Sequence, residues 1–64
     1  MKLYQVPNNT WVKLIDDATA PPGARPAKTE EEILFDHIDG MYSFCKDREG
    51  NVVHVSASQE VELV

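Results

Sequence analysis

Five side chains of the types that bind metals or transfer protons lie in the second half of this sequence: Asp36, His37, Asp39, Cys45 and His54. Zinc sites usually place such ligands at short fixed spacings, such as paired cysteines or a histidine pair flanking a glutamate on a helix. Neither pattern is present, and a single cysteine cannot form an internal disulfide. We therefore expect no bound metal and no other cofactor.

The same residues are weak candidates for catalysis. Covalent catalysis needs a nucleophile beside a general base, together with a site that stabilises an oxyanion. His37 and His54 are capable of proton transfer in a suitable setting, but no nucleophile accompanies them. Cys45 is predicted to point away from both histidines, so we interpret it as a small buried hydrophobe. We therefore expect a protein that is not an enzyme.

Length and composition favour one small folded domain that spans residues 1–64. Hydrophobic residues make up 42% of the chain and charged residues 27%, which is ordinary for a globular protein, although so short a chain has a thin core. The net charge of −5 opposes binding to nucleic acid or anionic lipid, so a protein partner is expected. The free cysteine, and a sequence without a recognisable secretory signal or membrane span, favour the cytoplasm.

The first half of the chain is predicted to be extended and then irregular. Residues 2–6 are interpreted as a short strand, and residues 10–15 as a second extended segment after a turn. Residues 16–28 contain three of the four prolines, which disfavour both helix and central strand. We therefore predict a long surface loop there.

Residues 29–39 are ambiguous between helix and strand. Thr29 followed by Glu32 is a capping-box pattern, and Gly40 is a possible helix end. Against this, the Asp39-Gly40 dipeptide is a strong signal for a two-residue hairpin turn, and β-prone residues follow it. We favour a hairpin and keep the helix as the alternative.

The remaining segments complete a β-rich order. A polar turn at residues 46–51 leads into residues 52–55, whose β-branched side chains predict a central strand. After a short polar kink, the alternation of residues 60–63 predicts a closing strand. Strand, long loop, hairpin, tight turn, kink and strand are the order of a Src-homology-3-like (SH3-like) barrel. We expect an all-β domain of this five-stranded kind with a long proline-rich loop.

Residues 35–43 (FDHIDGMYS) and 50–54 (GNVVH) resemble short uncharacterised proteins encoded by bacteriophages, notably those of marine cyanobacteria. These two segments together contain 14 of the 64 residues of the chain. Those proteins have no activity that could be carried over. The resemblance therefore implies only a phage or phage-like origin inside a bacterial cell.

A turn at Asp39 and Gly40 pairs Ile38 with Met41 and His37 with Tyr42, and this register assigns two faces to the hairpin. The face predicted to be interior carries aliphatic and small residues, namely Leu34, Asp36, Ile38, Met41, Ser43, Cys45, Val53, Val55 and Ala57. The other face is amphipathic and carries Phe35, His37, Tyr42, Phe44, Lys46, Val52, His54 and Ser56. Its rings suit either contact with a partner or cover by the proline-rich loop.

Two functions remain open at this point. In the first, the chain is a non-enzymatic protein-binding module, most simply a homodimer, whose binding residues are Phe35, His37, Tyr42, Phe44 and His54. In the second, it is an acidic inhibitor or nucleic-acid mimic that occupies a basic groove of a host protein with Asp16, Asp17, Glu30, Glu31, Glu32 and Asp36. Salt separates them, because only the second should weaken steeply with ionic strength.

Overall fold

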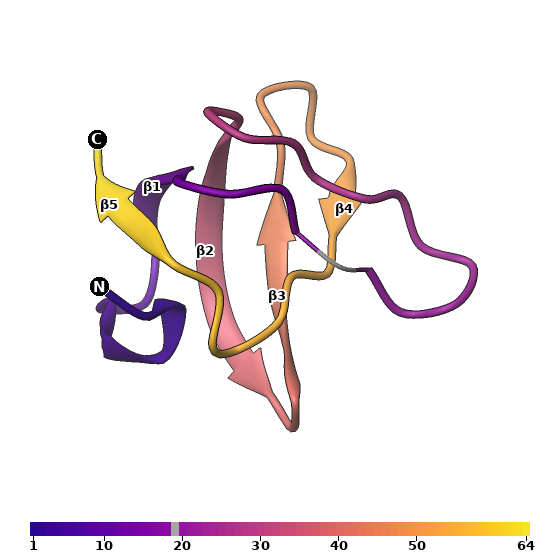
Figure 1. Ribbon diagram of the computed structural model, residues 1–64, viewed down its shortest axis with the longest axis horizontal. Coiled ribbons are helices and arrows are strands. Elements are labelled where there is room, and N and C mark those ends of the chain that lie inside the picture. The colour runs from indigo at the N-terminus through magenta and orange to yellow at the C-terminus, as the bar shows by residue number, and fades with distance from the viewer. Residues whose placement is uncertain (19) are drawn as a thin grey trace.

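The computed structural model describes residues 1–18 and 20–64, and these residues form a mainly β structure (Figure 1). The strands are β1 (Thr10–Leu14), β2 (Glu32–Asp39), β3 (Tyr42–Lys46), β4 (Val52–Val53) and β5 (Val61–Leu63). They form one antiparallel sheet of order β4-β3-β2-β1-β5. The mainly β prediction is confirmed. Because no ladder joins β4 to β5 among the described residues, the sheet is open, and the predicted barrel is not established.

The hairpin of β2 and β3 confirms the strand interpretation and excludes the helix, but its turn differs from the prediction. Asp39 pairs with Tyr42, so the turn consists of Gly40 and Met41. Gly40 takes a φ of 65° at the first turn position, where a type II′ turn requires glycine. Near the turn, each residue of β2 therefore pairs two positions further along β3 than predicted. A slip of two residues leaves every side chain on its predicted face.

A β-bulge at Asp36 changes the faces further along the hairpin. His37 pairs with Phe44, whereas Phe35 pairs with Cys45, and Asp36 between them has no partner in the ladder. A shift by one residue moves side chains to the opposite face of a sheet. Phe35 is consequently only 1% exposed and belongs to the core. The prediction that it lies on the amphipathic face was wrong.

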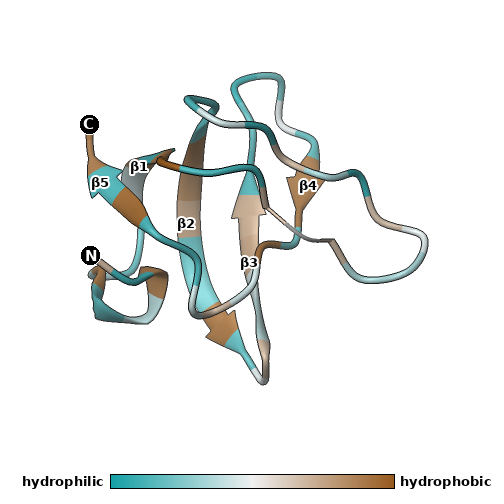
Figure 2. Cartoon of the chain, viewed as in Figure 1, coloured by the Kyte–Doolittle hydropathy of each residue, from teal (hydrophilic) through white to brown (hydrophobic). Residues whose placement is uncertain are grey.

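The core lies on one face of the sheet. Figure 2 shows that apolar and polar residues are interspersed along the strands. It consists of Leu3, Val6, Val12, Leu14, Ala18, Ala27, Ile33, Phe35, Cys45, Val53, Val55 and Val61. Buried Ser43, Cys45, Val53 and Val55 confirm part of the predicted interior face. The predicted burial of the remaining members was wrong, because Leu34 and Ala57 are half-buried and Asp36, Ile38 and Met41 are exposed, although Ile38 pairs with buried Ser43 and keeps its predicted face.

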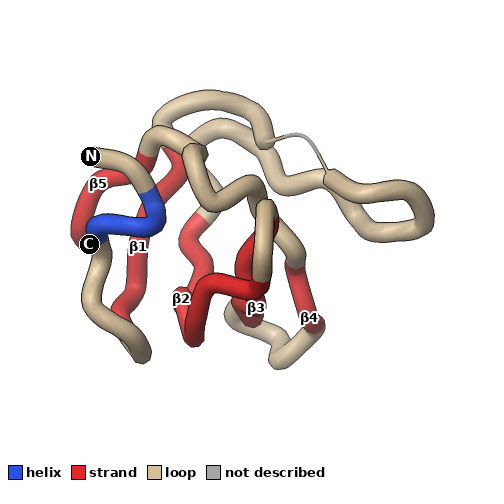
Figure 3. The backbone as a smooth tube through the Cα atoms, turned by 90° about the horizontal axis from the view of Figure 1, so that it is seen from below, coloured by secondary structure: helices blue, strands red, loops and turns tan. Residues whose placement is uncertain are grey.

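The described residues of the connection between β1 and β2, 15–18 and 20–31, which we call the strap, cross the core face of the sheet (Figures 1 and 3). Its described residues form no helix or strand, as predicted for residues 16–28; Thr19 lies outside them. Ala18 and Ala27 are buried with the core residues. The strap therefore packs over the face that contains Phe35, not over the amphipathic face.

The N-terminal segment is a short 3₁₀ turn, Leu3–Gln5, where the sequence predicted a strand. Local hydrogen bonds explain the difference, because the Gln5 main-chain N–H donates to the Lys2 oxygen at 2.9 Å and the Lys2 N–H donates to the Gln5 side chain at 2.8 Å. The Leu3 N–H also donates to the Gln59 oxygen at 2.9 Å, which holds the turn beside the chain that leads into β5.

The strand predicted at residues 52–55 is shorter and less central than expected. β4 contains two residues and lies at one end of the sheet, so the central placement was wrong. The closing strand is confirmed as β5, which occupies the other end. Among the described residues, no helix has the length and apolar character needed to cross a bilayer.

Candidate binding surface

Three aromatic rings form a continuous row on the face of the sheet opposite the core, and we call it the ring row: His37, Phe44 and His54. The pairing of β2 with β3 places His37 directly opposite Phe44. Their ring centroids are 5.5 Å apart at an interplanar angle of 8°, and the His54 ring meets Phe44 edge-on at 5.7 Å and 75°. Both are preferred geometries of ring pairs, so the row is a preformed surface.

Hydrogen bonds orient the two imidazoles of the ring row. His54 donates from Nδ1 to the main-chain oxygen of Ser43 at 3.0 Å, since a carbonyl oxygen can only accept. The Nδ1 of His37 lies 3.3 Å from the Asp36 carboxylate, which is also an acceptor. In the neutral ring the proton is then on Nδ1, and Nε2 is left as an acceptor. The row thus combines an apolar ring with two hydrogen-bonding edges.

Solvent reaches the ring row and the strand beside it. His37 is exposed, while Phe44 and His54 are half-buried. Next to them, Val52 of β4 pairs with Lys46 of β3 and keeps 44% of its surface exposed. An apolar patch with polar tips of this kind suits contact with another protein.

The structure separates the five predicted binding residues into three environments. His37, Phe44 and His54 come together as predicted. Tyr42 is half-buried and lines a groove beside the hairpin turn. Phe35 is removed from the surface by the bulge at Asp36.

The outer face continues across β2 to β1, which the sequence analysis missed. Trp11 pairs with Leu34, and both are half-buried. The guanidinium carbon of Arg48 lies 3.8 Å from the centroid of the Trp11 ring, a cation–π contact. The alternation of β1 gives a signal for this, because Trp11 and Lys13 flank the buried Val12.

The groove lies between the start of the strap, the hairpin turn and the segment before β5. Its volume is about 460 Å³, and it is lined by Asp16, Asp17, Met41, Tyr42, Ser56, Ser58, Gln59 and Glu60. Met41 is 81% exposed, so an apolar side chain lines the groove together with the carboxylates of Asp16, Asp17 and Glu60. The sequence carried no local signal for this groove, because its residues come from three distant segments.

The acidic residues proposed as a nucleic-acid mimic are partly paired within the chain. Asp17 accepts hydrogen bonds from the Thr29 N–H at 2.7 Å and from its hydroxyl at 2.8 Å, which lower the pKa of Asp17. Glu32 pairs with Arg48. These contacts leave fewer carboxylates available to a partner.

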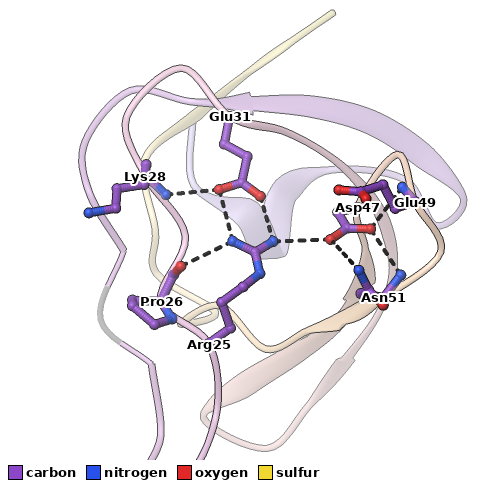
Figure 4. A network of polar contacts seen from close by, with 7 residues as sticks. All are labelled: Arg25, Pro26, Lys28, Glu31, Asp47, Glu49 and Asn51. Carbon is purple, nitrogen blue, oxygen red and sulfur yellow. Dashed lines mark hydrogen bonds and ion pairs between the residues drawn. The ribbon is translucent and has the colours of Figure 1, made fainter.

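A network centred on Arg25 engages two further carboxylates (Figure 4). Arg25 donates to Glu31 at 3.2 and 2.6 Å in a two-pronged contact and to Asp47 at 3.3 Å. The Arg25 hydrogen bonds lower the pKa of Glu31, and the backbone N–H of Asn51 is the main cause of the lowered pKa of Asp47. Because the partners belong to the strap and to the β3–β4 turn, this network joins two loops.

Within residues 1–18 and 20–64, no three His, Cys, Asp or Glu side chains are placed to hold a metal ion. Cys45 is buried on the core face, away from the ring row, and burial raises the pKa of its thiol. The chain matches no protein-family model, no curated protein and no solved structure. Its function must therefore be inferred from the surface geometry.

Proposed function

We propose that the chain is a small non-enzymatic protein-binding module that contacts its partner through the ring row and Val52. The observation that carries this proposal is the stacked, solvent-reachable row of three rings on the face that the strap leaves uncovered. A second copy of the chain is the simplest partner, because a symmetric interface uses the same patch on both subunits.

Preorganisation supports this role. Binding usually costs entropy, because flexible side chains lose freedom at the interface. Here Phe44 is held between two rings, and each imidazole has a hydrogen-bond acceptor at Nδ1. Less freedom remains to be lost on association. Rigid aromatic side chains with polar edges are also frequent anchors of protein interfaces.

The variant Phe44→Ser tests the proposed surface. We expect it to remain folded by circular dichroism and to lose self-association in sedimentation velocity and partner capture in pull-down experiments. Leu63→Ser is the matched control, since Leu63 is an apolar residue that is 56% exposed on β5, at one end of the sheet. Association that persists unchanged in folded Phe44→Ser, or that disappears equally in Leu63→Ser, contradicts the proposed surface.

We also propose that the sheet belongs to an SH3-like barrel. The strand order β4-β3-β2-β1-β5, the long strap after β1 and the short turn before β5 support this. A solution structure in which β1 and β5 pack face to face against β3 and β4 is the expected result. A flat open sheet would contradict it.

The resemblance of residues 35–43 and 50–54 supports a phage-encoded origin, and with it a role in the cytoplasm of a bacterial host. The acidic mimic has less support, because Asp17, Glu31 and Glu32 already have partners in the chain. Salt distinguishes the two functions: binding through the ring row should persist at high ionic strength, whereas binding through carboxylates should weaken sharply.

A further inference from the structure

The strap is firmly attached at its base. The Glu30 N–H donates to the Leu14 oxygen at 2.8 Å, and the Leu14 N–H donates to the Glu31 oxygen at 3.0 Å, which extends the pairing of β1 with β2. The Gln59 side chain donates to the Asp16 oxygen at 3.0 Å. Both ends of the strap are therefore tied to the sheet.

The far end of the strap has a much weaker attachment. Within the described part of the chain, residues 20–28 make one polar contact outside the strap, the 3.3 Å ion pair of Arg25 with Asp47. Their other hydrogen bonds stay within the strap, such as the 2.9 Å bond from the Ala18 N–H to the Ala27 oxygen. Closure at this end thus depends on a single ion pair.

Hydrogen bonds stabilise the turn that receives Arg25. Asp47 Oδ1 accepts hydrogen bonds from the main-chain N–H groups of Glu49 and Asn51, both at 2.9 Å, and its Oδ2 faces Arg25 (Figure 4). The Asp47 side chain is 11% exposed, so the ion pair is partly shielded from solvent. Arg25 is held in turn by Glu31, which orients its guanidinium toward the turn.

Apolar contacts add little to the closure. Among the described residues of the strap, the buried side chains are Ala18 and Ala27, each a single methyl group, and Ala20, Pro21 and Ala24 are half-buried. Burial stabilises in proportion to the apolar area removed from water, so these small side chains hold the strap weakly. The core face beneath contains Phe35, Cys45 and Val53, which are at most 1% exposed.

We infer that the strap is a latched cover whose far end opens and closes while the sheet stays folded, with the Arg25–Asp47 ion pair as the latch. Opening exposes the core face around Cys45 and presents a second apolar surface to solvent. Segments with few apolar contacts are those that open locally in native proteins. Salt favours the open state, because it screens an ion pair that solvent can reach.

The rate at which a thiol reagent labels Cys45 reports on this opening. The closed form should react slowly, because the thiol is buried and its pKa is raised. If Cys45 becomes accessible when the strap opens, its labelling rate should hardly change with urea at low concentrations, because little surface is exposed. If Cys45 becomes accessible only by global unfolding, the labelling rate should rise steeply with urea. We expect the labelling rate of the wild-type protein to be nearly constant at low urea concentrations, and we call this range the flat regime.

The variant Arg25→Gln should raise the rate in the flat regime about tenfold, because it removes charge-assisted hydrogen bonds. Arg48→Gln is the matched control: Arg48 lies in the same β3–β4 turn as Asp47 but pairs with Glu32 of β2 and not with a strap residue, so its loss should leave the flat regime unchanged. Raised salt should accelerate wild-type labelling in the same regime, which tests the latch without any mutation.

Three results overturn the inference. The first is wild-type labelling that follows global unfolding at every urea concentration. The second is an equal acceleration by Arg25→Gln and Arg48→Gln. The third is a flat regime that salt does not affect.

Discussion

His54 donates a hydrogen bond from Nδ1 to the main-chain oxygen of Ser43 at 3.0 Å, where an antiparallel ladder between β3 and β4 would otherwise continue. The Ser43 hydroxyl accepts from the Val55 N–H at 3.3 Å and donates to the Val55 oxygen at 2.8 Å. The Ser43 N–H still donates to the Val55 oxygen at 2.8 Å, so side chains replace one of the two main-chain bonds of this pair, the bond from the Val55 N–H to the Ser43 oxygen. This explains why β4 has two residues although its β-branched sequence continues.

Ser43→Ala should destabilise the protein by about 1–3 kcal/mol, because the buried Val55 N–H loses its acceptor. The measurement is urea unfolding followed by circular dichroism. Ser58→Ala is the control, since its hydroxyl contacts Ser56 on the exposed surface at 3.1 Å. Equal stability of the Ser43 and Ser58 variants would rule out the proposed role of the buried hydroxyl.

The two phenylalanines provide a test of the bulge at Asp36. Phe35→Ala should cost about 3–5 kcal/mol, because it leaves a cavity in the core. Phe44→Ala should cost much less, because Phe44 is half-buried on the outer face. Without the bulge the two residues would share a face and show similar losses. Free energies of unfolding from urea titration decide between the two registers.

Acid should destabilise the protein through four carboxylates whose pKa values are lowered in the folded state, Asp17, Glu31, Asp47 and Glu60. A carboxylate with a lowered folded pKa stabilises the fold above its unfolded pKa of about 4, and this contribution is lost as the pH falls through the folded pKa. The melting temperature should therefore decrease as the pH is lowered from about 5 to about 2.

A single substitution isolates one of these contributions. Asp17→Asn removes the carboxylate that accepts two hydrogen bonds from Thr29, so the melting temperature of this variant should vary less with acid pH. Glu49→Gln removes a carboxyl group that is not part of these contacts, and it should keep the wild-type slope. An unchanged slope in Asp17→Asn would show that this carboxylate does not contribute.

Cys45→Ala should lose only a packing contribution of about 1–2 kcal/mol, because the thiol is a small buried group beside the Ser43 hydroxyl. Chelators should leave the melting temperature of the wild-type protein unchanged. A fall in melting temperature with chelator would indicate a structural metal and contradict this prediction.

Local sequence determined the β class, the irregular strap and the presence of the hairpin, but not which two residues form its turn. Prolines exclude regular structure over residues 16–28, and Asp39-Gly40 followed by β-prone residues is sufficient to predict the hairpin. Alternation in β1 and β5 is likewise a property of neighbouring residues. The sequence also predicted that His37, Phe44 and His54 share one surface. This prediction holds because the observed slip of two residues in the turn preserves the faces.

Only the tertiary structure decided the positions that depend on residues far apart in the chain. The bulge at Asp36 places Phe35 opposite Cys45, and the core selects this register because it buries a large ring that pairing without a bulge would leave outside. The same dependence holds for Arg25 and Asp47, which are 22 positions apart and meet only when the strap folds over the sheet. No local pattern specifies such a contact, because its energy is gained only when distant segments are brought together.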